Sequence, residues 1–234
     1  MYQYKRTQTD DKSLEQYAKL LSEVFSNTNK FSKDFLKWQY KDNPNGGVVG
    51  IDAFLGNELA GHYVCIPVKY EFYGVEKKGL LSLNTAIGLK HRGKGLFTQL
   101  AKKTFELAIE EHFDFIIGVA NQNSTHGFIK KLEFELIGPL DVFIGIGRVD
   151  VIRPSKVRAL WSSEAIEWRI NNPSNILKQS GEYILSKSDI SLVNNTSILN
   201  FKPSYCNSLN KIYIQDGEII LKSVMDLKND EKAN

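Results

Sequence analysis

Apolar residues recur at helical spacing in two stretches near the N-terminus. Residues 13–27 carry apolar side chains three or four positions apart, as on one face of an amphipathic helix. A second helix is expected to begin after Ser32, whose hydroxyl can cap its first turn, and to end before Pro44 and the glycines that follow. The chain is therefore predicted to open with two helices that each bury one face.

The next stretch consists of strand-like runs that are separated by turn residues. Glycine-containing turns lie at residues 56–58 and 74–78. Strands are predicted at residues 48–55, 59–68, 70–73 and 79–89. Because no helical pattern separates these runs, we expect an antiparallel meander.

Helical spacing returns at Leu96, where a wide apolar face lies opposite a face of lysines and glutamates. A largely apolar run at residues 113–120 is typical of a buried central strand. A short helix is predicted at residues 124–132, and a strand from Phe134 onward. A meander followed by this strand–helix–strand order predicts an α/β protein of the α+β type, with a mixed, mostly antiparallel sheet flanked by helices.

The pattern weakens after residue 148. Residues 163–171 have helical spacing, and weak strand patterns follow at residues 183–185, 197–201, 211–214 and 218–221. We therefore divide the chain into a first domain, residues 1–148, and a small α+β extension, residues 149–234.

A short internal repeat crosses this boundary. Residues 38–44 (WQYKDNP) resemble residues 168–173 (WRINNP), so that a helix bearing tryptophan runs into Asn-Pro in both places. Two explanations stay open: the extension is an incomplete second copy of the first domain, or two unrelated helices end with the same common residues.

Composition narrows the function classes. The 234 residues are 42% hydrophobic and 24% charged, which is ordinary for a globular protein, and the net charge of +3 is too small to indicate nucleic-acid binding. No apolar run is long enough to span a membrane. The two cysteines, Cys65 and Cys206, have neither metal-ligand nor redox spacing. These features predict a soluble, cytoplasmic protein without a metal site.

The strongest chemical signal lies in residues 82–96, where an apolar strand enters a basic loop that opens directly onto a helix. The first amides of a helix lack intrahelical partners and lie at the positive end of its dipole. Gly93 and Gly95 would let the backbone approach a phosphate, while Arg92 and Lys94 add positive charge. The loop predicts a pyrophosphate site; the alternative is a basic turn that caps the helix without a ligand.

The glycine spacing fits neither the Walker loop nor the Rossmann loop. It resembles the acyl-CoA loop of the GCN5-related N-acetyltransferases (the GNAT superfamily), which has Gln or Arg first, Gly fourth and a small residue sixth. Arg92 and Gly95 match, and Phe97 departs from the small residue. The resemblance implies a GNAT fold over residues 1–148 and acetyl-CoA as co-substrate. It also implies that the pantetheine arm pairs with the backbone of Ile87, Gly88 and Leu89, and the pyrophosphate with the amides of Arg92, Gly93, Lys94, Gly95, Leu96 and Phe97.

A second motif of the superfamily is matched only in part. Asn121 or Asn123 takes the place of the asparagine that the resemblance assigns to CoA binding, and Phe134 matches the final phenylalanine. Ile129 stands where the superfamily often has a tyrosine that acts as an acid, and Glu133 stands where it has glycine. These two departures raise the hypothesis of a GNAT fold that binds CoA without catalysis.

Three residues are candidates for catalysis by a GNAT enzyme. His126 begins the short helix, and an imidazole suits acid or base work at neutral pH; an exposed first-turn histidine is the alternative. By the resemblance, Asn84 and Thr85 would lie where the strand splays from its neighbour and would orient an amine or its water. Paired ladder residues are the alternative for both.

The preferred hypothesis is therefore an acyl-CoA-dependent N-acyltransferase that acts by direct transfer on a small-molecule amine, with a nucleotide-linked amino sugar as the first candidate acceptor. The resemblance of the WQYKDNP and RGKGLF segments to a branch associated with amino-sugar metabolism suggests that acceptor. A third hypothesis keeps acyl transfer but takes aminoacyl-tRNA as donor. An unpaired sheet edge in the extension would favour a homodimer.

Overall fold

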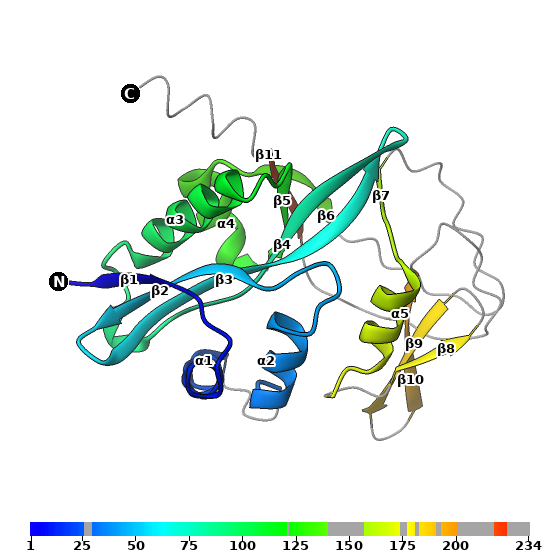
Figure 1. The fold of residues 1–234 in the computed structure, drawn as a ribbon, viewed down its shortest axis with the longest axis horizontal. Helices are drawn as coiled ribbons and strands as arrows, with labels where there is room; N and C mark the ends of the chain where they lie inside the picture. Colours follow the sequence, from blue (N-terminus) through cyan, green and yellow to red (C-terminus); the bar gives the residue numbers. More distant parts are fainter. Residues whose placement is uncertain are drawn as a thin grey trace.

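The computed structural model describes residues 1–25, 30–120, 122–139, 157–173, 177–180, 183–190, 193–200 and 218–223. Within these residues a mixed eight-stranded sheet forms the centre of the molecule (Figure 1). Helices α1 and α2 cover one face of this sheet, and α3 and α4 cover the other. The expected α+β architecture is confirmed.

The strands follow the order β1-β2-β3-β4-β5-β11-β6, with β7 paired to β3. All neighbours are antiparallel except β4 and β5, which are parallel. The bounds are β1 Gln3–Arg6, β2 Val49–Leu55, β3 Glu58–Phe72, β4 Val75–Ile87, β5 Phe115–Ala120, β6 Glu135–Pro139, β7 Val157–Ala159 and β11 Glu218–Ser223. A second sheet of three strands contains β8 Leu177–Ser180, β9 Tyr183–Ile190 and β10 Val193–Asn200.

The helices lie close to their predicted positions because their patterns are local. Their bounds are α1 Asp11–Phe25, α2 Lys33–Tyr40, the short 3-10 helix η1 Leu89–His91, α3 Leu96–Glu110, α4 Gln122–Leu132 and α5 Ser163–Ile170. Ser32 caps α2 as predicted: its Oγ accepts a hydrogen bond from the Phe35 amide at 3.1 Å.

Two hydrophobic clusters fix the helices on the sheet. On one face, Leu96, Leu100 and Phe105 of α3 pack with Phe128 of α4 against β2, β3 and β5. On the other face, the apolar stripes of α1 and α2 pack against Val64 and other residues of the sheet. The apolar stripe of each helix thus decides which surface it covers.

Several strands differ from the sequence prediction. The runs predicted at residues 59–68 and 70–73 form one strand, β3, because β4 and β7 both pair with its second half. Strands β1, β7 and β8 were not predicted; each has only three or four residues, too few for an alternating pattern. The strand predicted at residues 211–214 lies outside the described part of the chain.

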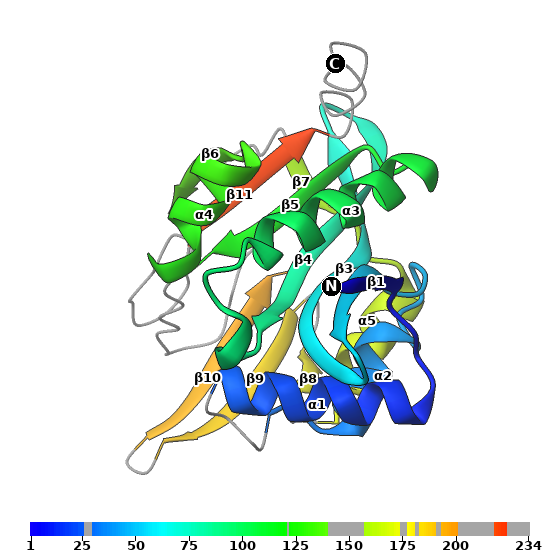
Figure 2. The same ribbon diagram turned by 90° about the vertical axis from the view of Figure 1, so that its left-hand side faces the viewer.

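The C-terminal segment contributes to the first sheet. Figure 2 shows β11 between β5 and β6, where Leu221 pairs with Ile117 on one side and Glu135 on the other. Strand β7 adds to the same sheet by pairing with the end of β3, at residues 70–72. The domain boundary at residue 148 stays a prediction, but two strands beyond it complete the sheet that begins before it.

The repeated tryptophans meet in space. Trp38 Nε1 donates to the Trp168 carbonyl at 2.7 Å, and Trp168 Nε1 donates to the Trp38 carbonyl at 2.8 Å. The rings stack with centroids 4.5 Å apart and planes inclined by 13°. The contact is reciprocal between α2 and α5, and antiparallel strands follow each helix. The incomplete duplication stays a prediction, and these features support it.

We predict that Trp168→Ala lowers the free energy of unfolding by about 2 kcal/mol, because it removes one ring stack and one indole hydrogen bond. Trp168→Phe keeps a stacking ring and should cost about 1 kcal/mol. Urea unfolding followed by circular dichroism measures both values. Equal stability of the two variants would show that the stacked rings contribute nothing.

Candidate active site

A bulge in β4 separates this strand from β5. The parallel pairing runs from Gly79 opposite Phe115 to Ser82 opposite Gly118, and no described residue of β5 pairs with β4 beyond that point. In the pairing of β3 with β4, Asn84 and Thr85 lie together opposite one residue, and Asn84 has a φ of +48°. Asparagine tolerates this left-handed conformation. The bulge leaves one edge of β4 open, which is the splay expected from the resemblance.

The loop after β4 runs directly to the N-terminus of α3. Gly93 and Gly95 both have a φ of +75°, a conformation that glycine adopts without strain, and Gly95 is the N-cap of the helix. Because glycine brings no capping side chain, the first amides of α3 have no partner from the cap. Arg92 and Lys94 are exposed beside them. The segment has the geometry of an anion cradle.

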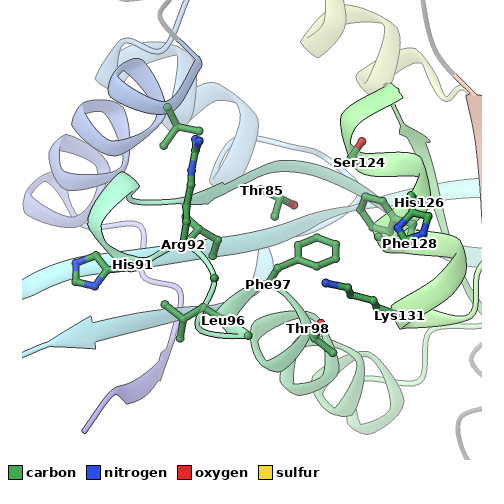
Figure 3. Close-up of a pocket in the computed structure, with 15 residues that line it drawn as sticks. Thr85, His91, Arg92, Leu96, Phe97, Thr98, Ser124, His126, Phe128 and Lys131 are labelled. Carbon is green, nitrogen blue, oxygen red and sulfur yellow. The ribbon is translucent and has the colours of Figure 1, made fainter.

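This cradle opens into a cavity of about 630 Å³ bounded by α3, the open part of β4 and α4 (Figure 3). The cavity is lined by Val24, Thr85, Ile87, His91, Arg92, Gly93, Gly95, Leu96, Phe97, Thr98, Ser124, His126, Gly127, Phe128 and Lys131. Eight of the predicted site residues therefore meet in one place: Thr85, Ile87, Arg92, Gly93, Gly95, Leu96, Phe97 and His126.

The remaining predicted residues lie elsewhere. Gly88, Leu89 and Lys94 belong to the loop but do not line the cavity, and Leu89 points into solvent with 65% of its surface exposed. Asn121 lies outside the described residues, and the side chain of Asn123 is not described. Asn84 contacts α2 on the opposite face of the sheet.

Phe97, which replaces the small residue of the superfamily, is accommodated by Gly127. The Phe97 ring packs edge-on against Phe128 at a centroid distance of 5.4 Å. A Cβ atom on Gly127 would lie 3.2 Å from the ring, closer than ordinary contact. The large residue on α3 thus faces a glycine on α4, and the cavity stays open between the two helices.

Helix α4 contributes polar side chains to the cavity. His126 is exposed and lies with Ser124 and Lys131 on its wall (Figure 3). The sequence analysis identified His126 but missed Ser124 and Lys131, which match no motif, and Val24, which reaches the site from α1. These residues reach the cavity only because α1 and α4 pack around the loop, and the sequence alone does not show that packing.

Glu133, which replaces the glycine of the superfamily motif, also has a local structural explanation. Glu133 follows α4 with a φ of +57°, which is the left-handed conformation that favours glycine at a helix end. For a residue with a Cβ this costs about 1 kcal/mol. Glu133 Oε2 lies 3.5 Å from the buried Lys222 Nζ of β11. This ion pair ties the end of α4 to the strand that completes the sheet.

A chain of polar residues lies behind the bulge, on the face covered by α1 and α2. Asn84 Nδ2 donates to Tyr40 Oη at 2.9 Å, Tyr40 Oη lies 3.0 Å from His62 Nε2, and His62 Nδ1 lies 2.6 Å from Asp52 Oδ1. Burial raises the pKa of Tyr40 well above that of a free phenol, so its hydroxyl keeps its proton. The sequence analysis assigned no role to His62. The available signal was an acidic residue in the apolar stretch of β2, Asp52, and a histidine in that of β3, His62.

Cys65 lies buried in the core beneath α3. Burial raises the pKa of the Cys65 thiol to about 12. No group of three or more His, Cys, Asp or Glu side chains in the described part of the chain is placed to hold a metal ion. No helix in that part is both long and apolar enough to cross a membrane.

Solved structures with the same fold include several acyltransferases. A probable N-acyltransferase from Enterococcus faecalis superposes with a TM-score of 0.64 at 10% identity, over 96% of this chain and 73% of that chain. A GCN5-related N-acetyltransferase from Anabaena variabilis gives 0.63 at 13% identity, over 95% and 73%. Saccharomyces cerevisiae N-myristoyltransferase with bound myristoyl-CoA gives 0.57 at 10% identity, over 88% and 66%.

Sequence comparison gives the family. No curated protein matches the sequence. A family model described as an acetyltransferase (GNAT) domain matches residues 4–137, which is more than half of the chain and includes the bulge, the loop and the cavity. The chain therefore belongs to the GNAT acetyltransferase family.

Proposed function

We propose that this protein is an acyl-CoA-dependent N-acyltransferase that moves an acetyl or short acyl group to a primary amine. The observation that carries the proposal is the continuity of the cavity from the amides of the glycine loop to the bulge of β4. The loop suits a pyrophosphate, and the open edge of β4 offers backbone groups to an extended pantetheine arm. The likeness in fold to an N-myristoyltransferase that was solved with myristoyl-CoA supports a CoA-type donor.

The transfer is proposed to be direct. The amine nitrogen attacks the thioester carbon, the C–S bond breaks, and one proton moves from nitrogen to the departing sulfur. His126 on the cavity wall is the proposed carrier of that proton, in place of the tyrosine that Ile129 replaces. Thr85, also on the wall, would orient the reacting groups. Much of the rate would come from holding the two substrates together.

The acceptor is proposed to be a small primary amine, and amino sugars are the first class to test. A second candidate function is CoA binding without catalysis, which the replacement of the family tyrosine by Ile129 favours. The two candidates share the cradle and differ in turnover. Binding and turnover are therefore measured separately.

Calorimetric titration with acetyl-CoA tests the cradle. Arg92→Glu should weaken binding by about 10- to 100-fold, because it replaces a charge-assisted contact with repulsion. Lys102→Glu makes the same charge change on the exposed face of α3 and should leave affinity within about twofold of wild type. Wild-type protein that does not bind acetyl-CoA would contradict both candidate functions.

Release of CoA thiol with glucosamine or a nucleotide-linked amino sugar as acceptor tests catalysis. His126→Gln should lower kcat by about 100-fold, because proton transfer by a side chain contributes that order of rate. Its affinity for acetyl-CoA should stay unchanged. Tight binding by wild-type protein without thiol release across primary amines would favour the non-catalytic function.

Cys65 should take no part in the transfer. With a pKa of about 12, about one thiol in 10,000 is ionised at pH 8, so we expect no alkylation of Cys65 by iodoacetamide in the folded protein. Alkylation should be complete in urea, where the thiol is solvated. Peptide mass spectrometry follows this cysteine alone. Acetyl-CoA that acetylates Cys65 in the folded protein would contradict direct transfer.

A further inference from the structure

We propose that Asp52, His62 and Tyr40 act as positioning residues that hold the carboxamide of Asn84 in one orientation, with Oδ1 presented to the acceptor amine. This inference rests on the proposed N-acyltransferase function. It assigns a catalytic role to the polar chain behind the bulge, on the sheet face opposite the cavity.

Asp52 sets the direction of the hydrogen bonds. Its carboxylate accepts from Tyr17 Oη at 2.6 Å and from Thr7 Oγ1 at 3.2 Å, and it lies 2.6 Å from His62 Nδ1. A carboxylate oxygen accepts hydrogen bonds, so the imidazole hydrogen that faces Asp52 lies on Nδ1. His62 Nε2 is then left as an acceptor.

The direction continues through Tyr40 to the bulge. The Tyr40 hydroxyl donates to His62 Nε2 at 3.0 Å, so its oxygen is free to accept from Asn84 Nδ2 at 2.9 Å. Burial raises the pKa of Tyr40, which keeps this donor protonated. Every donor in the chain from Asn84 to Asp52 has one acceptor.

This order fixes which end of the Asn84 carboxamide is occupied. The second hydrogen of Nδ2 goes to Gln39 Oε1 at 2.6 Å, so both donors of the amide are used within α2. Among the described residues no donor bonds Asn84 Oδ1. The residue sits in the bulge, next to the edge of β4 that β5 leaves open. An amine N–H directed at Oδ1 would turn the nitrogen lone pair away from it, toward a thioester.

The burial of the chain argues that it serves more than packing. Asp52 is 1% exposed and His62 is 0% exposed. Replacing buried ionic groups with apolar residues of similar volume is often neutral or stabilising, so a core that needs only stability does not require them. An orientation-specific chain of four polar side chains, from Asn84 to Asp52, suits the fixing of one amide.

The other titratable groups around His62 belong to the same chain. The Tyr17 ring of α1 stacks on the His62 imidazole with centroids 4.2 Å apart. The Tyr40 hydroxyl of α2 is hydrogen-bonded to His62 Nε2. Asp52 of β2 is the cross-strand partner of His62. A change at any of these residues should therefore reach Asn84 through the same hydrogen bonds.

The decisive variant is Tyr40→Phe, and Tyr63→Phe is its matched control. Tyr63 is equally buried and its hydroxyl is also hydrogen-bonded, in this case to Ser82 Oγ at 3.0 Å, but the residue packs in the cluster on the α3 side. Tyr40→Phe should lower kcat/KM for glucosamine by about 10- to 100-fold, as expected for the loss of one positioning contact. Acetyl-CoA affinity should stay within about twofold. Tyr63→Phe should change neither quantity.

Hydrogen exchange of the Asn84 side-chain amide provides a second test, which needs neither acetyl-CoA nor an acceptor. In protein labelled with ¹⁵N-asparagine, the Asn84 side-chain amide is assigned by its loss in Asn84→Asp. Its hydrogens should exchange slowly in wild type and in Tyr63→Phe, and at least 10-fold faster in Tyr40→Phe, because one donor loses its acceptor. Should Tyr40→Phe fail to fold, Gln39→Leu removes the other acceptor from a partly exposed position and should show the same change.

The kinetic measurement and the exchange measurement together distinguish failure of this inference from failure of the proposed function. Unchanged exchange of the Asn84 amide in Tyr40→Phe overturns the inference whatever the enzymatic activity. Wild-type turnover with equal kcat/KM in Tyr40→Phe and Tyr63→Phe also overturns it and leaves the function intact. Wild-type protein that binds no acetyl-CoA overturns the function and, with it, the role of Asn84 toward an amine.

Discussion

The parting of β4 from β5 is the constraint on which the site depends. Two parallel strands that kept pairing would satisfy each other's backbone groups and leave no edge for a ligand. The bulge at Asn84 and Thr85 ends that pairing while β3 still holds β4 in the sheet. One edge of a central strand therefore stays open, and the loop of Gly93 and Gly95 follows directly from its end. Hydrophobic packing on both faces stabilises the sheet around this opening.

The two faces of the bulge carry different chemistry. Thr85 points to the cavity shared by α3 and α4, while Asn84 points to the polar chain beneath α1 and α2. Leu83 and Asn84 both face α1 and α2, whereas Thr85 faces the cavity, so the bulge interrupts the regular alternation of the strand. The proposed donor site and the proposed position of the acceptor amine thus lie on separate surfaces of one strand.

Two of the three departures from the superfamily pattern have a partner residue far away in the sequence. Phe97 faces Gly127, and Glu133 pairs with Lys222. The large Phe97 ring is matched by a glycine, and the Glu133 carboxylate is matched by a lysine of opposite charge. The replacement of the family tyrosine by Ile129 has no such partner in the described chain, which is why catalysis is assigned to other side chains.

The sequence alone determined the helices, most strands of the first sheet and the glycine loop, because helical spacing, capping and loop chemistry act between residues close in the chain. Tertiary structure decided the rest. The turn at residues 56–58 sets a register, opposing Leu55 to Glu58, that would place Asp52 opposite Gly61, and a shift between Ala53 and Phe54 brings it to His62 instead. Strand β11 enters the sheet from nearly eighty residues beyond β6. Such pairings depend on the backbone partners available in the folded protein, which no local pattern encodes.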